Sequence, residues 1–212
     1  ITPTTNGTYN LDRWKVFIST GSKFSVQQNA GSVTPPAGFS NYLGVTSLAA
    51  TSVGSTDYYF ITQKIEGYNM ADFNWGSANA KTVTLSFWVR SSLTGTFGGW
   101  LRNSAGDRFY IFSYTINAAN TWEQKTITVN LSTGTASGTW NSTNDSGLTI
   151  AWGLGAESNR KGDTYLNTWG TLGSTLNLQS ASQTNWASTS GATFLTISSV
   201  TLLIVAITSF DT

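Results

Sequence analysis

The sequence has no cysteine and no histidine among its 212 residues. Without cysteine there can be no disulfide bond, no thiolate nucleophile and no zinc–sulfur site. Without histidine the chain lacks the commonest general base, the Ser-His-Asp triad and the commonest metal ligand. These absences exclude several major kinds of catalytic site, and we predict no metal site from the motifs.

Charged residues are also scarce, at 10% of the chain, against about a quarter in typical soluble domains. The net charge is +1 and no run of Lys or Arg occurs, so the sequence predicts no nucleic-acid binding. Glycoside hydrolysis needs two carboxylates on one face, and nothing in the spacing of the acidic residues provides such a pair. We therefore predict no catalytic residues and expect that the protein is not an enzyme.

A membrane span is not expected either. The first ten residues are polar and do not resemble a signal peptide. Residues 194–210 are apolar, but they lack flanking Lys or Arg and are slightly short for a bilayer. Their Val, Ile and Thr content favours strands instead.

Aromatic residues are plentiful, with nine Trp, eight Tyr and eleven Phe, which supply a large core without disulfides. Hydrophobic residues alternate with polar ones in many short segments, and Gly, Asn and Ser turns separate these segments. Strands are predicted at residues 15–19, 23–27, 42–48, 57–66, 82–91, 97–103, 108–116, 122–130, 148–155 and 193–210.

This pattern predicts an all-β protein, an antiparallel β-sandwich. Residues 20–22 (TGS) are typical of a hairpin that would join the first two strands. Residues 1–10 are interpreted as an N-terminal arm or linker, and residues 11–212 as a single domain. Two stretches, 132–147 and 156–192, are predicted loops, and the longer one is of a length that is usually functional or ordered by a partner.

An ordered series of short segments resembles a known family. The series comprises Leu11–Trp14 (LDRW), Gln63–Gly67 (QKIEG), Val83–Ser92 (VTLSFWVRSS), Gly95–Thr96, Ser113–Ile116 (SYTI), Thr121–Val129 (TWEQKTITV), Thr139–Trp140, Gly147–Leu148 and the end of the chain from Gly191 to Ile204, which begins GATF. It resembles jelly-roll, carbohydrate-binding-module-like domains at the C-terminal ends of bacteriophage tail fibre and other virion proteins. The resemblance spans residues 11–212 and implies a sandwich of the jelly-roll type.

The end of the chain departs from the family pattern. Leu203 and Val205 stand where the family commonly has a carboxylate and a glycine. The more apolar last strand suggests burial against a neighbouring subunit or another viral protein, and it weakens any site that depends on the missing carboxylate.

The resemblance implies a non-catalytic module on the virion surface, assembled in the host cytoplasm. As a tail fibre or receptor-binding domain it would recognise host cell-surface glycan, with weak sites multiplied by trimeric display. The alternative is a structural capsid decoration or head-fibre protein that acts mainly through protein–protein contacts. The expected partners are other virion proteins and, in the first case, host surface polysaccharide. A homotrimer is expected from the fibre resemblance alone.

Two candidate ligand-binding residues share one face of a predicted strand. Trp88 and Arg90 lie two positions apart, and an indole beside a guanidinium can hold a sugar ring by stacking and planar hydrogen bonds. The competing interpretation is that Trp88 belongs to the core and Arg90 to its rim.

Four further tryptophans lie in or beside turn-rich segments: Trp100, Trp140, Trp169 and Trp186. Exposed aromatic side chains in loops usually mark a surface that a ligand or another protein covers. They are candidates for glycan binding, or they plug the ends of the sandwich or a subunit interface.

No cofactor is predicted, although a structural calcium ion is considered near the chain ends. Asp12 and Asp211 would meet there if the ends of the jelly roll adjoin, and calcium prefers several oxygen ligands. The sequence has no dense Asp/Asn loop that would complete such a site.

Overall fold

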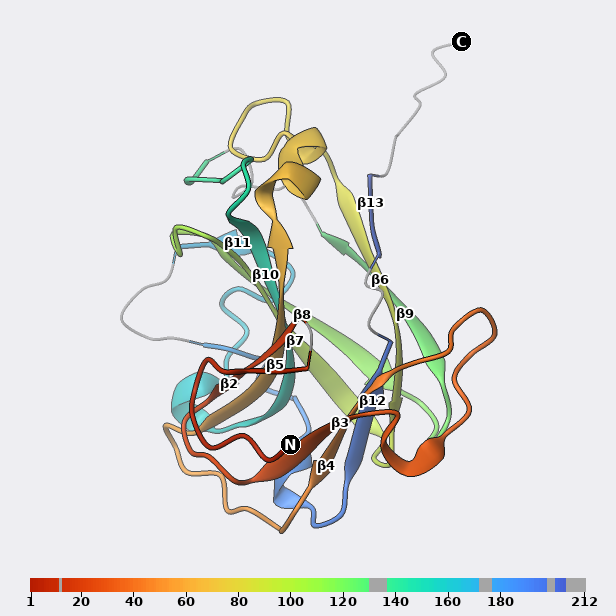
Figure 1. Cartoon of the computed structure of the whole chain (residues 1–212). Coiled ribbons are helices and arrows are strands. Elements are labelled where there is room, and N and C mark those ends of the chain that lie inside the picture. The colour runs from red at the N-terminus through yellow and green to blue at the C-terminus, as the bar shows by residue number, and fades with distance from the viewer. Residues whose placement is uncertain (12, 130–136, 172–176, 198–200, 205–212) are drawn as a thin grey trace.

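A computed structural model of the chain describes residues 1–11, 13–129, 137–171, 177–197 and 201–204 (Figure 1). Figure 1 shows two antiparallel sheets that face each other, with β5 and β10 on one side and β6 and β9 on the other. The prediction of an all-β antiparallel sandwich of the jelly-roll type is confirmed.

Sheet A is the seven-stranded sheet. Its strands, in spatial order, are β1 (Tyr9–Leu11), β2 (Trp14–Ile18), β5 (Tyr58–Glu66), β10 (Ser146–Ala156), β7 (Gly95–Asn103), β8 (Phe109–Ile116) and β11 (Trp169–Gly170). The adjacent strands β2, β5, β10 and β7 are far apart in the sequence, so residues that adjoin on this part of the sheet come from distant segments.

Sheet B contains the remaining strands. They are β3 (Phe24–Gln28), β4 (Leu43–Ser47), β12 (Thr193–Thr196), β6 (Val83–Ser91), β9 (Glu123–Val129) and β13 (Thr201–Ile204). β12 and β13 pair with successive parts of β6, and β9 pairs along the opposite edge of β6. Short 3₁₀ helices in the described connections are η1 (Ala30–Ser32), η2 (Gly67–Phe73), η3 (Ser158–Arg160) and η4 (Trp186–Ser188).

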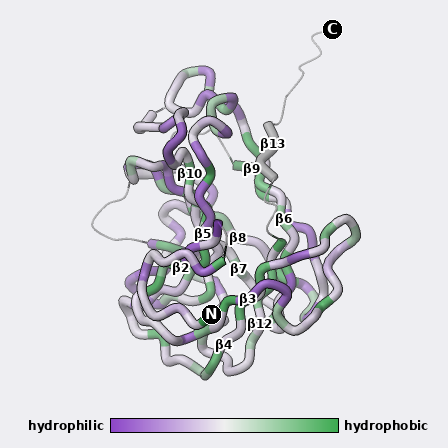
Figure 2. Tube along the Cα trace, viewed as in Figure 1, coloured by the Kyte–Doolittle hydropathy of each residue, from purple (hydrophilic) through white to green (hydrophobic). Residues whose placement is uncertain are grey.

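The core lies between the sheets because the strands alternate as the sequence predicts. Along β6 every second side chain is buried, from Val83 to Ser91. Hydrophobic and hydrophilic residues are accordingly interspersed along the described chain in Figure 2. The fully buried large side chains include Trp152, Phe87 and Phe194, and burial of such aromatics is the main source of stability in a fold without disulfides.

The predicted hairpin at residues 20–22 is wrong, although both of its strands exist. β2 pairs with β1 and β5 in Sheet A, whereas β3 pairs with β4 in Sheet B. The N-terminal segment packs closely against the connection between the two strands: the backbone N–H of Ser22 donates to Pro3 O at 2.7 Å, and a Cβ on Gly21 would lie 2.4 Å from Thr4 O. The chain instead passes from one sheet to the other.

The segment interpreted as an N-terminal arm packs against both sheets. Val26 N, in β3, donates to Ile1 O at 2.7 Å, and Gly7 N donates to Val16 O, in β2, at 2.9 Å. Ile18 N also donates to Asn6 Oδ1 at 2.9 Å. Residues 1–7 therefore connect β2 with β3 across the edge of the sandwich.

The long predicted loop at 156–192 covers part of the outer face of Sheet A. Leu178 packs there with Trp100 and Phe60. Two buried glutamines lie over the glycine-rich surface of β10: Gln183 Nε2 donates to Gly153 O at 3.1 Å and Gln179 Nε2 to Ala156 O at 3.4 Å. A Cβ on Gly153 would lie 2.4 Å from Gln183 Nε2, so a larger residue at that position would have to displace the glutamine side chain.

Within the described ranges, no helix is long and apolar enough to cross a membrane. Apart from Ile197, the described residues of the apolar stretch 194–210 belong to strands β12 and β13. Residues 198–200 and 205–210 of that stretch lie outside the described residues.

Candidate ligand-binding groove

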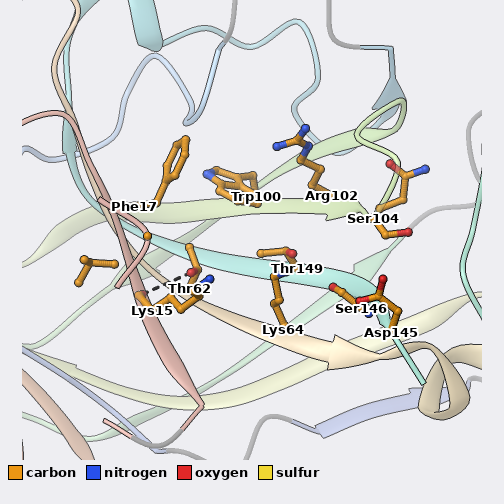
Figure 3. Close-up of a pocket in the computed structure, with 13 residues that line it drawn as sticks. Lys15, Phe17, Thr62, Lys64, Trp100, Arg102, Ser104, Asp145, Ser146 and Thr149 are labelled. Carbon is orange, nitrogen blue, oxygen red and sulfur yellow. Dashed lines mark hydrogen bonds between the residues drawn. The ribbon is translucent and has the colours of Figure 1, made fainter. Parts of the chain in front are cut away.

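A groove of about 310 Å³ lies on the outer face of Sheet A, beside the part covered by the long loop (Figure 3). We call it the Sheet A groove. Four neighbouring strands and the turns at two of their ends contribute to it. Its lining residues are Gly7, Lys15, Val16, Phe17, Thr62, Lys64, Trp100, Arg102, Asn103, Ser104, Asp145, Ser146 and Thr149.

The side chains of the groove point outward because of strand alternation. In β2, Trp14, Val16 and Ile18 pack in the core, which places Lys15 and Phe17 on the opposite face. The same alternation turns the even-numbered residues of β5 and β7 and the odd-numbered residues of β10 outward.

Strand register sets these outward side chains in two rows. Lys15 is paired with Thr62, Thr62 with Ala151, and Ala151 with Trp100. The next row consists of Lys64, Thr149 and Arg102. Neighbouring strands are about 4.8 Å apart, so the Cα atoms of Lys64 and Arg102 are separated by about 10 Å, with Thr149 between them.

Aromatic rings form one end of the groove. The Phe17 ring stacks on Tyr58 with centroids 4.6 Å apart, and it meets the edge of Trp100 at 5.8 Å. Trp100 is only 4% exposed, because Phe109 and Phe60 pack against it. Phe17, which is half-buried, therefore presents more ring surface to the groove than Trp100 does.

A polar network holds the turn at the other end. Asn103 Oδ1 accepts from Arg108 N at 3.0 Å, and Asn103 Nδ2 donates to Asp107 Oδ1 and to Thr139 O. The hydrogen bond from Asn103 does most to lower the pKa of Asp107 below its ordinary value; the Thr139 N–H and the Arg108 charge act in the same direction, and burial opposes them. The network fixes Asn103 and Ser104 at the rim of the groove.

The charges around the groove are mostly positive. Lys15, Lys64 and Arg102 line it, together with one carboxylate, Asp145. The Lys15 ammonium also lies 4.5 Å from the centroid of the Tyr9 ring. Of the described residues, none provides a carboxylate within 4.0 Å of these three cations.

Of the tryptophans and the arginine predicted to bind ligand, Trp100 alone lines the Sheet A groove. Trp88 and Arg90 lie on the outer face of Sheet B and do share one face of β6. Trp88 is half-buried against Tyr42, Leu195 and Ile197, and Arg90 Nε donates to Asn120 O at 2.9 Å.

Trp140 and Trp169 meet at one end of the sandwich. Together with Trp75 they form a cluster of edge-to-face rings, with centroids 4.9 to 5.4 Å apart. Trp169 is 5% exposed, whereas Trp140 is half-buried and lines a second pocket of about 220 Å³ with Asn74 and Met70. This arrangement matches the interpretation that these tryptophans plug an end of the fold.

Trp186 is fully buried between the sheets, where its ring meets the edge of Phe24 at 6.4 Å. A side chain with no exposed surface does not contact an external ligand in this conformation. We therefore leave Trp186 and Trp169 out of the proposed site.

Sequence reasoning did not identify Lys15, Phe17, Thr62, Lys64 or Thr149 as site residues. Each occupies an outward position of a strand, which the alternation does indicate. The missing information was the spatial order β2-β5-β10-β7, because only that order brings residues from four distant segments together.

No group of three or more Asp, Glu, His or Cys side chains that could hold a metal is found within the residues the structure describes. Asp12 and Asp211, the residues considered for a calcium ion, both lie outside those residues. The calcium expectation stays a prediction.

No protein-family model matches the sequence, and no curated protein matches it. Similar solved structures include the family 11 carbohydrate-binding module of the cellulosomal cellulase Lic26A-Cel5E of Clostridium thermocellum, at 14% identity over 96% of this chain and 95% of that chain, with a TM-score of 0.44. A CBM4 structure shows 14% identity over 91% and 95%, with a TM-score of 0.43.

Another similar structure is the enzymatically active domain of tailspike protein 4 of bacteriophage CBA120. It shows 12% identity and a TM-score of 0.46, covering 97% of this chain and 22% of that chain. At these identities and TM-scores, the likenesses do not assign a ligand or an origin to the present protein.

Proposed function

We propose that this protein is a non-catalytic glycan-binding module and that the Sheet A groove is its binding site. The observation that supports this most is the composition of the groove: an aromatic ring at one end, threonine and serine hydroxyls along its length, and charged groups beside them. Sugars present apolar C–H faces and many hydroxyls, which such a surface can contact together.

The size of the groove fits weak binding at a single site. A volume of about 310 Å³ is at the small end of ligand pockets, and an open sheet face can contact the middle of a polymer rather than enclose a small molecule. Display of several copies would raise the overall affinity through effective concentration.

The groove favours binding over hydrolysis. Its lining includes a single carboxylate, Asp145, whereas glycosidases use a pair. Trp100 and Arg102 project from a central strand rather than a mobile loop, which suits a preformed binding surface.

We also propose that the module acts on the surface of a phage virion, as a homotrimer bound to other virion proteins. The ordered sequence series between Leu11 and Phe194 supports this assignment through its resemblance to virion modules. The low charge content fits a protein that is packed into a larger particle.

Glycan binding is tested with a multivalent form of the protein on an array of bacterial surface polysaccharides. Phe17→Ala removes the ring that lines the groove, and binding should fall by about tenfold, the equivalent of about 1.4 kcal/mol for a lost aromatic contact. Phe39→Ala is the matched control, because Phe39 is also half-buried but packs on the outer face of Sheet B. Equal loss in both variants, or no binding by the parent protein, contradicts the proposal.

The virion assignment has a separate test. Antibodies against the protein should label phage particles, and light scattering should give the mass of three chains. Labelling of particles together with complete absence of glycan binding would favour the capsid decoration or head-fibre alternative.

A further inference from the structure

We infer that the Sheet A groove selects acidic glycans, those that carry carboxylate groups, over neutral ones. This inference rests on the proposed glycan-binding function and adds the charge class of the ligand. It is carried by three cations, Lys15, Lys64 and Arg102, that the fold brings into one groove from three separate strands.

Positive charge is concentrated in the groove to an unusual degree for this chain. Three of its eleven Lys and Arg residues line the groove, against one of the eight Asp and Glu residues that the structure describes. The lining thus has a net charge of +2, while the whole chain has +1, so the remainder of the protein is slightly negative. The groove is where an anionic polymer would be attracted.

The cations are spaced so that a chain-like ligand could meet them in turn. Lys64 and Arg102 lie in one row, about 10 Å apart at Cα with Thr149 between them. Lys15 lies in the adjacent row, next to Thr62, whose Oγ1 donates to Lys15 O at 3.3 Å (Figure 3). Hydroxyl groups between fixed charges match a polymer that carries both hydroxyls and carboxylates.

The carboxylates of the described residues do not neutralise this surface. Asp145, at the rim, accepts a hydrogen bond from Ser146 N at 2.6 Å, and Glu66, which follows Lys64 on the same face of β5, is exposed. Neither lies within 4.0 Å of a groove cation, and in the part of the chain that is described Arg102 Nε has no hydrogen-bond partner. The guanidinium lies against Gly106 instead.

An acidic glycan fits the groove better than nucleic acid does. Nucleic-acid surfaces typically extend Lys and Arg contacts along a stripe of many phosphates, whereas these cations are confined to one groove of about 310 Å³. The aromatic end of the groove is also small, since Trp100 is almost fully buried.

The test compares acidic polymers with neutral derivatives of the same backbone: polygalacturonate with its methyl ester, and alginate and hyaluronan with their carboxyl-amidated forms. The multivalent protein should bind at least one acidic polymer about tenfold more tightly than its neutral partner, and raising NaCl from about 50 mM to about 500 mM should abolish that difference by screening. Lys64→Gln should weaken acidic binding about fivefold, and Lys81→Gln, at another exposed lysine that lies outside the groove lining, should not.

Arg102 provides a second readout. Arg102→Lys keeps the charge and should retain most of the acidic preference, whereas Arg102→Gln should lose it. Equal binding of acidic and neutral polymers overturns the inference but leaves the proposed function standing. Binding to no polymer overturns both, and equally tight binding of a thymidine oligonucleotide overturns the inference in favour of general anion binding.

Discussion

At the scale of single residues, Tyr114 shows the cost of filling a core with aromatics. Its ring packs between the sheets, with Phe87 at 5.1 Å, and its hydroxyl is buried with no hydrogen-bond partner among the residues that are described. Burial raises the pKa of Tyr114 far above its ordinary value. The folded protein therefore holds this hydroxyl in its neutral form over a wider pH range than the unfolded chain does.

The raised pKa of Tyr114 predicts that the protein becomes less stable as the pH rises in the alkaline range. Above about pH 10 the unfolded chain loses the Tyr114 proton while the folded protein keeps it, so the free energy of unfolding should fall by about 1.4 kcal/mol per pH unit from this group. Tyr114→Phe should remove that slope and should raise stability at neutral pH by about 1 kcal/mol, since a partnerless buried hydroxyl is deleted.

Urea unfolding between pH 7 and pH 11 measures both effects. Tyr110→Phe is the control, because its hydroxyl donates to Thr128 O at 3.4 Å and its loss should not stabilise the protein. An unchanged alkaline slope in the Tyr114→Phe variant would count against this account of the residue.

At the scale of elements, the segment from η3 to η4 contributes both to the cover of Sheet A and to the core. Leu178 and the two glutamines 179 and 183 cover one part of Sheet A, and at its end Trp186 inserts between the sheets. The segment thereby limits how much of the outer face remains open as the Sheet A groove.

Trp186→Ala should therefore destabilise the whole fold rather than affect a binding surface. A large buried aromatic lost from a core costs about 4 kcal/mol, whereas Trp122→Ala, at a half-exposed position on Sheet B, should cost about 1 to 2 kcal/mol. Differential scanning calorimetry should show a much larger fall in Tm for the first variant. Equal falls would mean that Trp186 does not anchor the core.

The elements also show what sequence alone could predict. The alternation of hydrophobic and polar residues indicated nearly all the long strands and the inward face of β6. Successive side chains of a strand point to opposite faces, so burial of one face produces this alternation directly. The alternation could not show that β2 and β3 belong to different sheets, because it gives the inward face of a strand but not the strand with which that strand pairs. The sequence indicated that tryptophans were candidate ligand-binding residues. It could not distinguish Trp100, which lines the groove, from Trp186, which is buried in the core.

At the scale of the whole molecule, the groove is a product of topology. Phe17, Thr62, Trp100 and Thr149 come from four strands that only the crossed order of Sheet A makes neighbours. The fold thus brings together segments that contain no local motif, and together they form one surface with an aromatic end and a row of cations. Such a site can be found from structure but not from any single stretch of sequence.

The claim that the Sheet A groove binds glycan is tested most directly by mapping amide chemical-shift changes during titration with cello-, xylo- and galacturono-oligosaccharides. We predict that at least one of them shifts the amides of residues 15–17, 62–64, 100–102 and 149, which surround the Sheet A groove. Shifts confined to Sheet B around Trp88 and Arg90, or none with any of the three, would contradict it.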